Sequence, residues 1–143
     1  MTVRDVLKGK GHDVYSIGPN ASVFDALTLM ADKNIGAVLV VEAGRTLGIF
    51  TERDYSRQVV LKGRASKDTP VRDVMTTRVV YVTPGSGMDD CMALMTSKRC
   101  RHLPVVEAGQ LVGVLSVGDV VKAVISDKQF TIKQLENYIT SGG

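Results

Sequence analysis

Hydrophobic residues follow the period of a helix and then that of two strands. A helix is predicted after Ser22, which suits an N-cap, because the next apolar residues fall at positions i, i+3, i+4 and i+7. These residues are Val23, Ala26, Leu27 and Met30. Short β-branched runs at 37–41 and 47–50 predict an antiparallel hairpin, since the turn between them is too short for a helical crossover. A strand at 14–17 and a helix at about 52–61 complete the unit.

The same order of elements occurs twice. Residues 17–55 align without a gap on residues 82–120, and 12 of the 39 pairs are identical. The second copy predicts a helix with Met88, Cys91, Met92 and Met95 on one face, strands at 79–82, 103–106 and 111–115, and a helix at about 117–125. Val3-Arg4-Asp5-Val6 is repeated by Val71-Arg72-Asp73-Val74 at a longer spacing, which predicts an inserted loop at 8–12. Two such small units are expected to share one apolar interface as a pseudo-twofold pair.

The predicted boundaries are 1–66 for the first domain and 67–128 for the second, with a helix and tail at 129–143. Residues 131–140 form an extra helix in this prediction, with Ile132, Leu135 and Ile139 on one side. That helix either covers an edge of the core or docks a partner. Gly142-Gly143 is expected to be frayed.

Composition limits the possible functions. With 143 residues, 44% hydrophobic and 23% charged, the chain is expected to be globular. A net charge of +3 and the lack of Trp give little support to nucleic-acid binding. Cys91 and Cys100 are expected to be reduced thiols, since they make no disulfide framework and no obvious zinc site. No export signal or membrane-length apolar run is visible, so a soluble cytoplasmic protein is expected.

A Gly-x-x-Thr/Ser-x-x-Asp motif occurs in both copies where a strand meets a helix. Its residues are Gly48, Thr51 and Asp54 in the first copy and Gly113, Ser116 and Asp119 in the second. A hydroxyl with an acid three residues later is also a capping box, and a single copy would favour that structural role. However, a helix N-terminus suits phosphate, and a carboxylate one turn later suits the hydroxyls of a ribose. The glycine leaves room for a ligand or for close packing at the hairpin.

The duplicated plan, this motif and the strand Leu103-Pro104-Val105-Val106 resemble a tandem pair of CBS domains, regulatory modules named after cystathionine β-synthase. The resemblance spans Val3 to Val124, and the tail at 134–140 is similar to the end of stand-alone bacterial proteins described as signal-transduction proteins. It implies an α+β fold in which two β-α-β-β-α units pack with pseudo-twofold symmetry. It further implies adenosine nucleotides in clefts between the units, and a homodimer of four units in a flat disc.

By position, the resemblance implies that Thr51 and Asp54 hold phosphate and ribose in the first cleft. Arg101 and His102 of the other unit would reach the phosphate, and Ser116 and Asp119 would serve the second cleft. The residues placed around the base are Gly18, Val23, Ile35, Gly36 and Ala37 in the first cleft, and Thr83, Met88, Cys100 and the backbone at His102 in the second.

The two clefts are expected to differ, because Arg101-His102 aligns with Gly36-Ala37. An Arg fork on phosphate typically contributes about 1.5–3 kcal/mol, so the Asp54 cleft is predicted to be the primary site. The second cleft either stays empty or admits a bulkier compound such as NAD. An ion pair at a subunit contact remains an alternative for Arg101, and a half-buried structural role for His102.

The function expected is that of a non-catalytic regulatory module that binds AMP, ADP or ATP, AMP foremost, and signals to an unidentified partner protein. The alternative is an interaction or dimerisation scaffold with vestigial clefts. An enzyme is disfavoured, because no Gly-rich phosphate loop and no nucleophile with its base is visible. No cofactor or metal is expected to be required.

Overall fold

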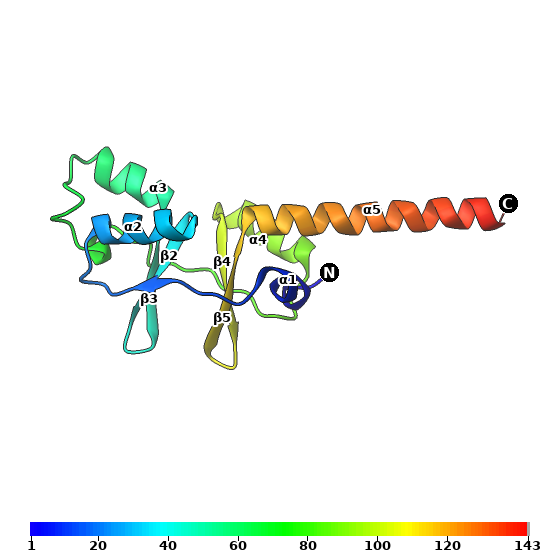
Figure 1. Cartoon of the computed structure of the whole chain (residues 1–143), viewed down its shortest axis with the longest axis horizontal. Helices are drawn as coiled ribbons and strands as arrows, with labels where there is room; N and C mark the ends of the chain where they lie inside the picture. Colours follow the sequence, from blue (N-terminus) through cyan, green and yellow to red (C-terminus); the bar gives the residue numbers. More distant parts are fainter. Residues whose placement is uncertain (143) are drawn as a thin grey trace. The chain divides into compact units, whose positions relative to one another are not determined.

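A computed structural model describes residues 1–142 of the chain, and the side chains of residues 1–140 (Figure 1). Its contacts form two compact units. One holds Val14–Val79, and the other joins Met1–Asp13 to the residues from Val80 onward. The first 13 residues therefore pack with the second repeat. The boundary predicted at 66 follows the order of the sequence and assigns these residues to the first domain.

The unit of residues 14–79 contains a three-stranded sheet in the order β1-β2-β3. β1 lies parallel to β2, and β2 forms an antiparallel hairpin with β3, as the short turn predicted. Ser22 caps α2, since its side chain accepts a hydrogen bond from the Asp25 N–H at 3.0 Å. The elements are β1 (Ser16–Ile17), α2 (Val23–Lys33), β2 (Ala37–Glu42), β3 (Arg45–Thr51), α3 (Glu52–Asp54), the π-helix η1 (Tyr55–Val60) and the 3-10 helix η2 (Val71–Asp73).

The other unit contains a second antiparallel hairpin, β4-β5, with the same register as the first. In each hairpin a strand of six residues pairs with one of seven, and the register shifts after the fourth residue of the first strand. The elements are α1 (Val3–Lys10), α4 (Met88–Lys98), β4 (His102–Glu107), β5 (Gln110–Ser116) and α5 (Val117–Gly142). The mixed helix-and-strand fold agrees with the α+β class predicted from the sequence.

The segment before each repeat packs on the other repeat through matching backbone hydrogen bonds. The N–H groups of Val3 and Arg4 donate to the carbonyls of Ser86 and Pro84. Val71 and Arg72 donate in the same way to Ala21 and Pro19. This exchange explains why the first 13 residues belong to the unit that contains α4.

Four predicted elements were wrong in extent. The loop expected at 8–12 begins only after Lys10, because α1 continues to that residue with Lys8 and Lys10 in its last turn, where cations suit the helix dipole. The strand expected at 79–82 is a single bridge between Val82 and Val105. The helix expected at 52–61 is α3 followed by η1. The separate helix at 131–140 is part of α5, because residues 126–131 contain no Gly or Pro to end it. The prediction for Gly143 lies outside the described residues.

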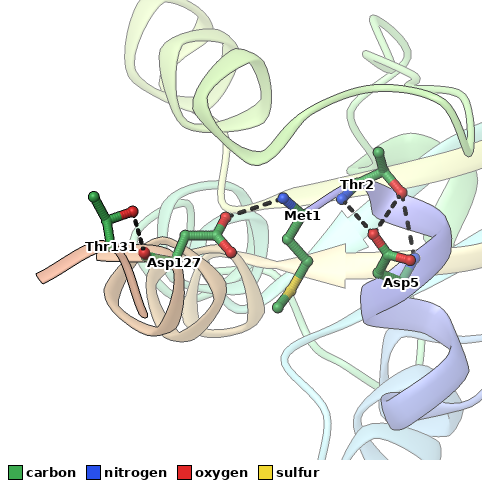
Figure 2. Close-up of polar contacts among 5 residues, drawn as sticks. All are labelled: Met1, Thr2, Asp5, Asp127 and Thr131. Atoms are coloured by element: carbon green, nitrogen blue, oxygen red, sulfur yellow. Dashed lines mark hydrogen bonds and ion pairs between the residues drawn. The ribbon is translucent and has the colours of Figure 1, made fainter. Parts of the chain in front are cut away.

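α1 begins with a capping box, and a nearby ion pair joins the N-terminus to α5 (Figure 2). The N–H and hydroxyl of Thr2 donate to the Asp5 carboxylate at 2.9 and 3.1 Å, and these bonds hold the pKa of Asp5 below its ordinary value. The amino group of Met1 lies 3.1 Å from the Asp127 carboxylate. These contacts fix α1 beside the repeat that it covers.

Each unit buries its own apolar cluster. The first consists of Val23, Ala26, Met30, Val38, Val40, Phe50, Val59, Val71 and Val74. The second includes Val3, Leu7, Met88, Cys91, Met95, Leu103, Val105, Leu115 and Val120. η2 and α1 thus each contribute apolar side chains to the unit on which they pack. Burial raises the pKa of the Cys91 thiol, which agrees with its predicted place in the core.

Candidate functional site

The first copy of the motif forms a tight turn at the end of β3. The N–H and hydroxyl of Thr51 donate to one oxygen of the Asp54 carboxylate at 3.0 and 3.1 Å. The Asp54 N–H donates back to the Thr51 hydroxyl at 3.2 Å. Both side chains are half-buried. The capping box considered from the sequence is therefore present, and it holds a carboxylate at the N-terminus of α3.

The segment that follows η2 completes this arrangement. The Thr76 hydroxyl donates to the other carboxylate oxygen of Asp54 at 2.9 Å. Its backbone N–H and C=O pair with those of Ile49 on β3 at 2.8 and 2.9 Å. We call Thr51, Asp54 and Thr76 the Asp54 half-site. Its described donors to the carboxylate are neutral hydroxyl and N–H groups.

Gly48 permits this close approach. A Cβ at position 48 would lie 2.6 Å from the Thr76 carbonyl oxygen and 2.8 Å from the Met75 sulfur. In the second copy, a Cβ at Gly113 would lie 2.8 and 2.9 Å from the two terminal methyl groups of Leu7. Of the two explanations that the sequence left open for these glycines, the structure shows the packing one.

The second copy repeats the turn with serine. The Ser116 N–H and hydroxyl donate to Asp119 at 2.8 and 3.0 Å, and the Asp119 N–H donates to Ser116 at 3.2 Å. Here the additional partner is Lys10, whose amine lies 2.5 Å from the Asp119 carboxylate and 2.6 Å from the Val114 carbonyl oxygen. We call Ser116, Asp119 and Lys10 the Asp119 half-site. The two half-sites thus have the same backbone geometry and different charge.

The charge of Lys10 alters two neighbouring groups. Burial alone would raise the pKa of Asp119, but hydrogen bonds from Lys10 and Ser116 outweigh it and hold that pKa below 3.8. Burial and the positive charges of Lys10 and Arg101 lower the pKa of His102 below 6.5, against a smaller opposing effect of Asp119. The lowered pKa favours the neutral form of the His102 ring, which can accept a hydrogen bond at one ring nitrogen.

The aligned residues Gly36 and Arg101 play the same backbone role. The Gly36 carbonyl accepts the Glu52 N–H at 3.1 Å, and the Arg101 carbonyl accepts the Val117 N–H at 2.8 Å. Arg101 is exposed, while His102 is half-buried. The alignment predicted that the two repeats differ at this position. The structure shows that the backbone hydrogen bond is the same in both repeats and that the side chain differs.

The remaining predicted residues lie around these turns and in the cores. Val23 and Met88 are fully buried in the two clusters. Gly18 and Thr83 are exposed, and the backbone N–H of Thr83 donates to the Ser86 hydroxyl at 3.3 Å. Half-buried positions are Ile35, Gly36, Ala37 and Cys100. Within each unit the structure brings the hydroxyl and the carboxylate together. The meeting of Arg101 and His102 with the Asp54 half-site stays a prediction, as do the residues around the base.

Lys10 and Thr76 were missed in the sequence analysis. Both follow the repeated segment that begins at Val3 and Val71, which was the available signal.

Within residues 1–142, no cluster of His, Cys, Asp or Glu is suited to a metal ion. In the same part of the chain, no helix has both the length and the apolar character needed to cross a membrane.

Comparison with known proteins identifies the repeat. Residues 2–60 and 71–126 match the family model of the CBS domain. The chain belongs to the CBS-domain family. The matched segments each contain one copy of the motif, so the CBS repeat and the internal repeat coincide.

Among curated proteins, the chain is 38% identical over 150 residues to the mitochondrial CBS domain-containing protein CBSX3 of Arabidopsis thaliana, covering 99% of this chain and 73% of the relative. Among solved structures, it is 52% identical to a CBS-domain protein of Burkholderia ambifaria MC40-6, with a TM-score of 0.86 and coverage of 92% and 99%. A CBS-domain protein of Agrobacterium tumefaciens is 45% identical, with a TM-score of 0.82 and coverage of 86% and 98%. These similarities extend over nearly the whole chain.

Proposed function

We propose that this CBS-domain pair is a non-catalytic regulatory module that binds an adenosine nucleotide, AMP foremost, and transmits its occupancy to a partner protein. The observation that carries the proposal is the Asp54 carboxylate, held at a helix N-terminus by Thr51 and Thr76. A carboxylate oxygen has two lone pairs. The oxygen that accepts the Thr76 hydroxyl can therefore accept a ribose hydroxyl as well.

A structural relative supports the choice of ligand. The CBS-domain protein PAE2072 of Pyrobaculum aerophilum was solved in complex with AMP, and it shares the fold of this chain with 22% identity and a TM-score of 0.73. In the proposal, Thr51 and the N–H groups at the start of α3 face the phosphate. In the same proposal, Arg101 offers its positive charge to the phosphate, and His102 offers a neutral ring.

The Asp54 half-site is the preferred ribose site in this proposal. Lys10 already neutralises the charge of Asp119, so a ribose hydroxyl gains less from that carboxylate than from Asp54. The Asp119 half-site either stays empty or takes a bulkier adenine compound such as NAD. Binding would signal only to the extent that the nucleotide prefers one arrangement of the protein over another.

A thermal-shift assay with AMP, ADP, ATP and NAD tests the proposal. A nucleotide at a hundred times its Kd stabilises the folded state by about 2.7 kcal/mol, which raises Tm by a few degrees. The Asp54→Ala, Arg101→Ala double variant should lose this rise, whereas Asp32→Ala, an exposed carboxylate on α2, should keep it. A native protein whose Tm responds to none of the four compounds would favour the scaffold with vestigial clefts.

A further inference from the structure

α5 carries an exposed apolar stripe that runs from Val121 to Ile139. From residue 128 to residue 140 every side chain is exposed, and in Figure 1 this part of the helix extends beyond α4 and α1. The apolar residues on one side recur at alternating spacings of four and three, with Lys128 at the remaining position of the series. They are Val121, Ile125, Ile132, Leu135 and Ile139, with exposed fractions from 38% to 70%.

This spacing is a heptad repeat. Ile125, Ile132 and Ile139 occupy the a positions, and Val121, Lys128 and Leu135 occupy the d positions. Apolar residues at the a and d positions form the seam of a coiled coil, whose natural partner is another helix with the same period. The stripe spans 19 residues, from Val121 to Ile139, and extends for about 27 Å along the helix.

We propose that α5 pairs with α5 of a second copy of this chain in an antiparallel coiled coil. In one register all six seam positions find a partner. Ile125 packs on the partner's Leu135, Ile139 on the partner's Val121, and Lys128 on the partner's Ile132. Because the pairing is reciprocal, the interface closes as a twofold dimer.

Charge selects the antiparallel direction. A parallel pair would place Lys128 against the same lysine of the other chain, and like charges at a seam are destabilising. In the antiparallel register, Lys128 faces an isoleucine and can extend its amine to the solvent. The same register places Lys122 opposite the partner's Glu136 on one flank, twice in the dimer, which makes the flank complementary in charge.

A hollow beside the stripe fits the other flank. It lies between α4 and α5, has a volume of about 440 Å³, and is lined by Asp89, Val124, Asp127, Lys128, Thr131 and Ile132. The antiparallel register places the partner's Tyr138 beside Val124. Tyr138 is 76% exposed in the single chain, and its hydroxyl in the hollow would meet carboxylates able to accept a hydrogen bond.

Sedimentation equilibrium of the full chain tests the pairing. Leu135→Glu should weaken dimerisation roughly a hundredfold or more, because the charge enters two seam layers. Phe130→Glu is the matched control, since Phe130 is 66% exposed on the opposite side of the same helix. It should dimerise like the native chain. A monomeric native protein, or a Leu135→Glu dimer as tight as the native one, would overturn the proposal.

Cysteine cross-linking tests the direction. A mixture of Ile125→Cys and Leu135→Cys chains should form a disulfide between positions 125 and 135, identified by mass spectrometry of the peptides. Ile125→Cys alone should not link to itself, since its two copies lie about 15 Å apart along an antiparallel pair. Self-linking of the single variant in place of the mixed product would contradict the antiparallel register.

Discussion

At the scale of residues, one motif supports two different electrostatic environments. Asp54 and Asp119 make the same bonds to the hydroxyl residue three positions earlier, yet Thr76 completes one half-site and Lys10 the other. The pairing of hydroxyl and carboxylate could be predicted, since a capping box depends on local spacing. Lys10 could not, because it lies 109 residues from Asp119 in sequence and meets it only through the packing of α1.

Replacing Lys10 by Met should raise the pKa of both Asp119 and His102, since each is lowered by the Lys10 charge. NMR titration of the two histidines and of the Asp119 carboxyl measures the shifts. Lys8→Met, an exposed lysine on the same helix, is the control and should leave both values near those of the native protein. An unchanged His102 pKa in Lys10→Met would show that Lys10 is too distant or too solvated to act on it.

The sign of the stability change follows from these directions. A group whose pKa in the folded state lies below its ordinary value contributes its full stability at any pH above that ordinary value. This contribution is lost as the pH falls through the pKa of the folded state. For His102 the decline begins below pH 6.5, and for Asp119 below pH 3.8. In Lys10→Met both declines should be shallower.

At the scale of elements, the hairpins and the first helix of each repeat could be predicted from local pattern. β2-β3 and β4-β5 match the predicted runs, because β-branched residues flank a turn of two residues with positive φ, Ala43-Gly44 and Ala108-Gly109. Residues 79–82 also look like a strand, but only Val82 bridges β4. The β propensity of these residues does not produce a strand, because the segment lacks long-range partners beyond the one at Val82.

Alanine at the two motif glycines should have unequal effects. Gly48→Ala presses a methyl group against the Thr76 backbone oxygen, which cannot move alone, so about 3 kcal/mol of unfolding free energy should be lost. Gly113→Ala meets only the ends of the Leu7 side chain and should cost about 1 kcal/mol. Urea denaturation of both variants measures the two losses of unfolding free energy. A Gly113→Ala loss equal to that of Gly48→Ala would show that Leu7 is as rigid as the backbone.

At the scale of the whole molecule, the repeat predicted the family and the fold class, whereas the packing units did not follow from it. The decisive contacts join Val3 to Ser86 and Val71 to Ala21, over separations at which sequence periodicity carries no information. α5 is a different case. Its apolar face was visible in the sequence, and the lack of Gly or Pro at 126–131, which lets the two predicted helices run on as one from Val117 to Gly142, is also a local feature of the sequence.

Calorimetric titration of the native chain with AMP, beside Asp54→Asn and Asp119→Asn, measures directly whether the two half-sites are unequal. We predict one AMP bound per native chain, at least a tenfold loss of affinity in Asp54→Asn through the lost carboxylate bonds, and native affinity in Asp119→Asn. Equal losses in the two variants, or full binding to Asp54→Asn with none to Asp119→Asn, would contradict the assignment of the ribose to Asp54.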